Sequence, residues 1–125
     1  MTTVTKTLVP LLAAVAGAAG SSKASPGANS GWKDLGTYDG GNIGLSITNG
    51  ASAPGVAPTI LIQVSPDNGA TVYDYQGMGG DVSANSVNTS TIWLDPGFRY
   101  ARVIGYGNSA NAVTFGADFS GVTRA

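Results

Sequence analysis

The sequence lacks the residue types on which most protein chemistry depends. It contains no Cys and no His, and all seven of its acidic residues are Asp. Thiol nucleophiles, disulfides and zinc–thiolate sites are therefore excluded, and the commonest general base and metal ligands are missing. Any catalysis would rest on Asp, Lys, Tyr or Ser alone, so we expect a protein that is not an enzyme.

Two loops carry oxygen atoms of the kind that calcium binds. Residues 39–42 read Asp-Gly-Gly-Asn and residues 67–69 read Asp-Asn-Gly. Neither segment approaches the spacing of an EF-hand, and turn chemistry accounts for both. We predict no metal site and no cofactor. The triplet at 88–90 matches the N-glycosylation sequon, which has meaning only in a eukaryotic secretory pathway.

The aromatic residues are the remaining candidates for ligand contacts. Tyr73, Tyr75 and Tyr106 lie near glycines and offer a possible sugar-stacking surface, but we favour cross-strand packing within a sheet. Trp32 and Trp93 are predicted to anchor the core, because aromatic side chains dominate cores. An exposed pair of aromatic residues would instead favour carbohydrate binding.

The elements that position these residues are predicted to be strands. The 125 residues include 19 Gly, 42% apolar residues and 10% charged residues, and Asp, Asn, Gly, Thr and Val are typical of turns and strands. This composition predicts one all-β domain. A surface with so few charges favours association with other proteins. The net charge of −1, with scattered Lys and Arg, offers no basic stripe for nucleic acid.

About seven segments have the pattern of strands, with turn residues about every ten positions. This pattern predicts an immunoglobulin-like or fibronectin-like β-sandwich, with a small jelly roll as the alternative. Residues 65–69 predict a hairpin turn, and residues 107–111 predict a hairpin between the last two strands. The expected strands are 32–38, 43–48, 60–64, 71–75, 91–94, 98–106 and 112–122.

The motif Leu94-x-Pro96-Gly97-x-x-Tyr100 ends one strand, turns, and begins the next with a tyrosine. It resembles the corner of fibronectin type III domains. The resemblance implies that the Tyr100 hydroxyl bonds to backbone a few residues upstream and fixes a crossover between the two sheets.

Arg102 departs from that pattern, because it occupies a position that faces the core in the family, and an unpaired buried charge is costly. Two arrangements remain: Arg102 lies at the open end of the sandwich, or Ala101, Val103 and Gly105 form the inward face.

The first 31 residues differ from the rest. Residues 8–19 are apolar and uncharged, and residues 20–31 read as a linker. We therefore expect an extended or partly helical arm and linker at 1–31 and a β-sandwich at 32–125. The apolar stretch is too short to span a membrane. It has features of a signal peptide, but we favour an arm held by a neighbouring subunit, because such an arm buries too little to order itself.

The arm offers five apolar side chains to a partner. Their burial would contribute several kcal/mol at about 25 cal/mol per Å² before ordering costs. The predicted partner-binding residues are Leu8, Val9, Leu11, Leu12 and Val15.

A low-charge sandwich with an apolar arm is similar to small structural proteins of tailed bacteriophages. The segment at residues 64–72 also resembles hairpins of such virion proteins. The resemblance implies a capsid decoration, or cement, protein that forms trimers and binds the major capsid protein on the capsid surface. The alternatives are an adaptor subunit of the tail, neck or head fibre, and a secreted carbohydrate-binding or adhesion module with a signal peptide.

Overall fold

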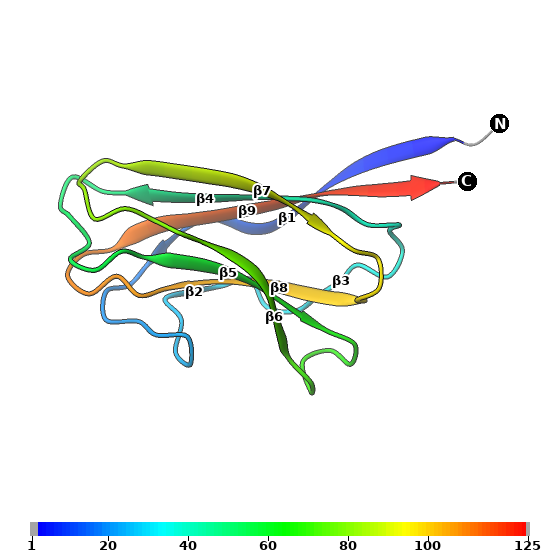
Figure 1. Ribbon diagram of the computed structural model, residues 1–125, viewed down its shortest axis with the longest axis horizontal. Coiled ribbons are helices and arrows are strands. Elements are labelled where there is room, and N and C mark those ends of the chain that lie inside the picture. The colour runs from blue at the N-terminus through cyan, green and yellow to red at the C-terminus, as the bar shows by residue number, and fades with distance from the viewer. Residues whose placement is uncertain (1–2, 125) are drawn as a thin grey trace.

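The computed structural model describes residues 3–124, which form nine strands joined by turns and loops (Figure 1). The same residues contain no helix long and apolar enough to cross a membrane. The strands are β1 (Val4–Gly17), β2 (Ala28–Asn29), β3 (Lys33–Asp34), β4 (Gly41–Asn49), β5 (Thr59–Ser65), β6 (Tyr73–Gly79), β7 (Val87–Leu94), β8 (Tyr100–Tyr106) and β9 (Val113–Arg124).

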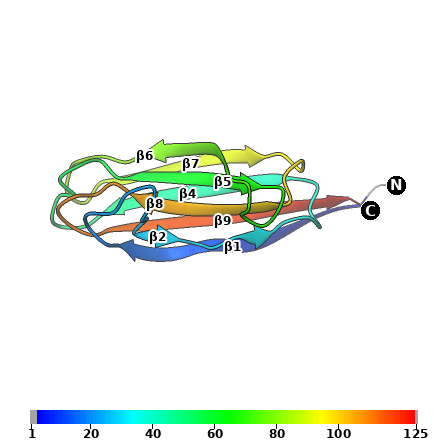
Figure 2. The same ribbon diagram turned by 90° about the horizontal axis from the view of Figure 1, so that it is seen from below.

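The strands form two antiparallel sheets that pack face to face (Figures 1 and 2). Sheet A is four-stranded, in the order β1-β9-β4-β7. Sheet B has five strands, in the order β2-β8-β5-β6, with β3 also paired to β8. The predicted all-β sandwich is confirmed.

The pairing order is that of a jelly roll, the alternative predicted from the sequence. The antiparallel pairs are nested along the chain: β5 with β6, β4 with β7, β2 and β3 with β8, and β1 with β9. A long hairpin rolled into two sheets has this pattern. The hairpin predicted between β8 and β9 is wrong, because these strands lie in different sheets.

Turn chemistry located one hairpin correctly. β5 and β6 pair directly, and the turn between them places Asn68 at φ 57° and Gly69 at φ 96°. These two residue types tolerate positive φ better than others. The local sequence of the turn therefore favours direct pairing of β5 with β6.

The core lies between the sheets and follows the alternation of the central strands. Phe115 of β9 is buried against two glycines, since a Cβ at Gly17 or Gly105 would overlap its ring. Other members of the core are Ile43, Leu45, Ile47, Ile60, Ile62, Val64, Leu94, Ala101, Val103, Val113, Ala117 and Phe119.

Arg102 points away from this core. Ala101, Val103 and Gly105 are buried on the inward side of β8, which confirms the second of the two predicted arrangements. The Arg102 guanidinium lies 4.8 Å from the Trp32 ring centroid, and its Nε donates to Gln63 Oε1 at 2.8 Å. The charge is therefore partnered on the outer face of sheet B.

The N-terminal segment is part of the sandwich, which corrects the division expected at residues 31 and 32. β1 pairs with β9 along most of its length. A register shift between Pro10 and Leu12 allows consecutive residues Leu11 and Leu12 both to be buried, as a bulge does.

The predicted linker is likewise held against the sandwich. The Gly20 amide donates to Asn108 O at 2.8 Å. The buried Asn108 side chain donates from Nδ2 to Gly17 O at 3.1 Å. Ser30 N donates to Val103 O at 3.0 Å. Residues 17–30 are thereby tied to β8 and to the loop that follows it.

Candidate binding surfaces

The outer edge of β1 is one exposed feature of sheet A. β1 is 14 residues long, and its second edge has no paired strand within the described chain. Its start and the end of β9 lie side by side at one end of the sandwich (Figures 1 and 2). An open strand edge presents unpaired backbone N–H and C=O groups, which another strand can bind.

The five predicted partner-binding residues are separated by the structure. Leu11 and Leu12 belong to the core, and Val9 is partly buried against it. Leu8 is 67% exposed. The Val15 side chain lies outside the described part of the structure, although its backbone lies opposite Phe115. Of the four described side chains, Leu8 alone is free to meet a partner.

The predicted tyrosine corner is made by a different tyrosine. Leu94 is buried, and Pro96 and Gly97 form an exposed turn after it. Tyr100 begins β8, but within residues 3–124 its hydroxyl makes no hydrogen bond to that turn. The turn between β7 and β8 is instead held by a tyrosine of β6. The prediction that the Tyr100 hydroxyl fixes this crossover is therefore wrong.

Tyr75 of β6 holds this crossover. Its hydroxyl donates to Trp93 O at 3.0 Å and accepts from the Asp95 amide at 3.3 Å. Sequence reasoning missed this contact because β6 and β7 belong to different sheets and are joined by a loop. The residue type was a correct clue, since a tyrosine hydroxyl commonly satisfies backbone groups at such corners.

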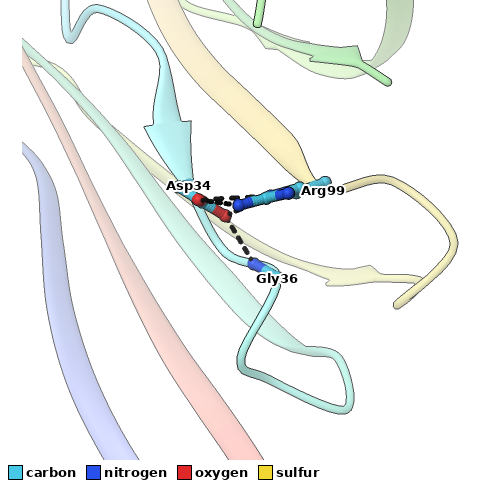
Figure 3. Close-up of polar contacts among 3 residues, drawn as sticks. All are labelled: Asp34, Gly36 and Arg99. Carbon is cyan, nitrogen blue, oxygen red and sulfur yellow. Dashed lines mark hydrogen bonds and ion pairs between the residues drawn. The ribbon is translucent and has the colours of Figure 1, made fainter. Parts of the chain in front are cut away.

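A cleft of about 340 Å³ lies beside the same turn, lined in part by an ion pair. Arg99 donates from Nη2 to Asp34 Oδ2 at 2.8 Å and from Nε to Oδ1 at 3.0 Å (Figure 3). The Arg99 guanidinium, aided by the Gly36 amide, lowers the pKa of Asp34. A carboxylate held in this way is a poor base. The ion pair links the segment that follows β3 to the turn that precedes β8.

A larger groove, of about 580 Å³, crosses the outer face of sheet A. Two neighbouring rows of outward residues line it. One row places Thr91 beside Gly44 and Gly44 beside Asp118. The other places Thr89 beside Ser46 and Ser46 beside Gly116. Ala13 of β1 also lines it, so all four strands contribute.

The groove has a wide centre because its floor carries small side chains. A Cβ built at Gly44 would meet no atom within 4 Å, so the space above that residue is open. The polar lining consists of hydroxyls and the Asp118 carboxylate, with no Lys or Arg among the described lining residues. No three acidic residues within 3–124 gather as a possible metal site.

Trp93 lies outside the lining of this groove and is not the core anchor that was predicted. Its side chain is 45% exposed. It lies on the outer face, two residues beyond Thr91, and packs against Gly40. The sequence contained the signal, because Ile92 and Leu94 face inward and strand alternation places the residue between them outside. Trp32 is half-buried over Arg102 on sheet B.

Comparisons with known proteins define the fold. No family model and no curated protein matches the sequence. A chain of infectious bursal disease virus, Gx strain, aligns with 95% of this chain at TM-score 0.57 and 6% identity. This chain spans only 32% of that viral chain. The protein is thus a two-sheet β-sandwich module similar to a domain of a viral protein.

Two further solved structures are similar. The K3 adhesin domain of Lys-gingipain from Porphyromonas gingivalis W83 aligns with 72% of this chain and 59% of its own, at TM-score 0.51 and 11% identity. The SPBc2 prophage-derived protein YomS aligns with 96% of both chains, at TM-score 0.49 and 14% identity. At such identities a likeness describes the fold and leaves function to the surfaces of this chain.

Proposed function

We propose that this chain is a structural protein of a virion, without catalytic activity, that decorates the capsid of a tailed bacteriophage. It bridges capsid subunits as a homotrimer and binds the major capsid protein at the capsid surface. The observation that carries the proposal is the open edge of β1, with the exposed Leu8 beside it. Jelly-roll domains are common in viral capsids, and the fold likeness to the viral chain supports this role.

The proposed attachment is strand addition to β1. The regular part of its ladder runs from Val4 to Val9, opposite Arg124 to Phe119, before the register shifts that follow Pro10. Proline and bulges discourage edge pairing, so a partner strand would bind the first half of β1. Backbone hydrogen bonds would supply affinity, and Leu8 would supply an apolar contact.

This mechanism differs from the docking of a free arm. Leu11 and Leu12 pack in the core of their own chain, so a partner cannot bury them without opening the sandwich. The few charges of the sequence suit a surface that meets other proteins. Repeated binding around a trimer would strengthen attachment through avidity.

The test compares two lysine substitutions on sheet A. Leu8→Lys places a charge at the β1 edge, and edge lysines oppose strand pairing. Thr48→Lys is the matched control, because Thr48 is exposed on the same sheet but lies on the interior strand β4. Each protein is mixed with phage shells that lack it, and bound copies per shell are measured after sedimentation.

We expect the native chain and Thr48→Lys to saturate the shells at high copy number, and Leu8→Lys to bind poorly. Saturation by Leu8→Lys would exclude the β1 edge as the attachment site. A few copies per particle would indicate an adaptor of the tail, neck or head fibre. A mature chain cut near Ala19 and found free of virions would refute the virion role and indicate a secreted module.

A further inference from the structure

The outer edge of β7 is the second open edge of sheet A, on the side of the sandwich opposite β1 (Figure 2). Within residues 3–124 no strand pairs with it. We propose that this edge pairs, in the antiparallel sense, with the β7 edge of a second copy of the chain, about a twofold axis at Thr89. The inference goes beyond the proposed function and requires neither the virion role nor the trimer.

Alternate residues of β7 direct their backbone groups toward the open edge. In an antiparallel ladder both backbone groups of a residue point to the same side, and the side alternates along the strand. The Asn49 amide at the end of β4 donates to Ser86 O at 2.8 Å, so the even-numbered residues that follow in β7 bond to β4. The odd-numbered residues, from Val87 to Trp93, therefore present their N–H and C=O groups to the open edge.

Tyr75 closes one end of this edge. Its hydroxyl donates to Trp93 O at 3.0 Å, so that carbonyl already has a partner from β6. The backbone groups of Val87, Thr89 and Thr91 have no hydrogen-bond partner among the other described residues. These three residues are centred on Thr89, and this fixes the register. A twofold axis at Thr89 pairs both backbone groups of each residue with those of the second copy.

The composition of β7 suits pairing with an identical strand. Val87–Leu94 contains no charged residue and no proline, and its ladder with β4 has no register shift. Charges, prolines and bulges are the features by which edge strands avoid pairing, and like charges placed opposite each other are destabilising. β1, by contrast, contains Lys6, Pro10 and register shifts. The β7 edge is therefore the better suited of the two for self-association.

The side chains that would meet across the axis are compatible as well. Thr89 lies opposite Thr89 of the second copy, and Val87 of each copy lies opposite Thr91 of the other. Threonine pairs and β-branched neighbours stabilise antiparallel ladders. Two four-stranded sheets joined in this way make one sheet of eight strands, within the usual range of about two to ten. The two β1 edges then lie at its opposite ends, where both remain open.

Opposite charges at position 89 test the axis. Thr89 is exposed and its backbone groups point away from β4, so substitution there leaves the sandwich intact. Thr89→Lys and Thr89→Asp each place like charges opposite each other in a self-pair, whereas an equimolar mixture of the two variants places Lys opposite Asp. Thr48→Lys is the matched control, because Thr48 is exposed on the interior strand β4 of the same sheet.

Sedimentation velocity of the full chains, from about 1 to about 200 µM, measures association in the micromolar range, and circular dichroism checks the fold. We expect the native chain and Thr48→Lys to form dimers, or hexamers where the proposed trimer also forms in solution. Each Thr89 variant alone should pair at least about a hundredfold more weakly, because its like charges lie one strand spacing apart. The equimolar mixture should recover the association.

Three outcomes would overturn the proposal. One is a native chain that sediments as a monomer or as a trimer throughout this range. Another is native association by Thr89→Lys and Thr89→Asp, because the copies would then meet through a different surface. The third is a mixture of the two variants that stays dissociated, because Thr89 would then lie away from the axis. No shell is present in these measurements, so this proposal and the virion role fail independently.

Discussion

Replacing Leu12 by alanine tests whether the N-terminal segment is a strand of the sandwich or a free arm. Leu12 is 4% exposed and lies opposite Ala117 of β9. Removal of a buried leucine side chain costs about 2–5 kcal/mol, and less where the site can collapse. Leu12 lies on an edge strand beside a register shift, so we expect about 2–3 kcal/mol. At about 4 °C per kcal/mol, Tm should fall by about 8–12 °C.

Leu8→Ala is the matched control, because Leu8 is in the same strand but 67% exposed. Its effect should lie within about 0.5 kcal/mol, as for most surface substitutions. Thermal unfolding followed by circular dichroism measures both variants. If Leu12→Ala and Leu8→Ala leave Tm equally unchanged, the packing of β1 against the core is refuted and residues 1–20 behave as a separate arm.

Three other substitutions test contacts elsewhere. Tyr75→Phe removes the hydroxyl that holds the β7–β8 turn and should cost about 1–2 kcal/mol in urea unfolding; an unchanged midpoint would show that this hydroxyl does not stabilise the crossover. Gly105→Ala forces a methyl group into the Phe115 ring and should lower Tm by overpacking worth about 1–3 kcal/mol, whereas an unchanged Tm would contradict this packing. The Thr71 amide, with nearby hydroxyls, lowers the pKa of Asp67, so its stabilisation is full above the unfolded pKa and is lost as pH falls through the folded pKa. Asp67→Asn should flatten that acid dependence, and an equally steep loss of stability in the variant would refute it.

Local signals in the sequence predicted the elements with strong alternation. Ile43, Leu45 and Ile47 identified β4, and the turn before Ala70 identified the β5–β6 hairpin. These features depend on neighbours along the chain, where propensity and side-chain alternation act directly. The two-sheet architecture follows from many such strands with one apolar face.

The pairing of the two chain ends could not be read from the same signals. The paired residues of β1 and β9 lie between 96 (Gly17 with Val113) and 120 (Val4 with Arg124) positions apart in the sequence, and no local pattern encodes such a contact. Its alternation is also broken, because Leu11 and Leu12 are both buried at the register shift. An Ala-rich strand with an irregular pattern therefore resembles a linker arm until its partner strand is known.

Strand addition to the β1 edge would leave the groove on the outer face of sheet A accessible. A strand added to β1 would hydrogen-bond within the plane of sheet A, whereas the groove opens perpendicular to that plane. The β1 residues that line the groove, Leu12 and Ala13, lie beyond the Val4–Val9 stretch proposed to pair with an added strand, so that strand would leave the floor of the groove uncovered. Many copies on one particle would strengthen attachment through the β1 edges, because linked sites bind with high effective concentration.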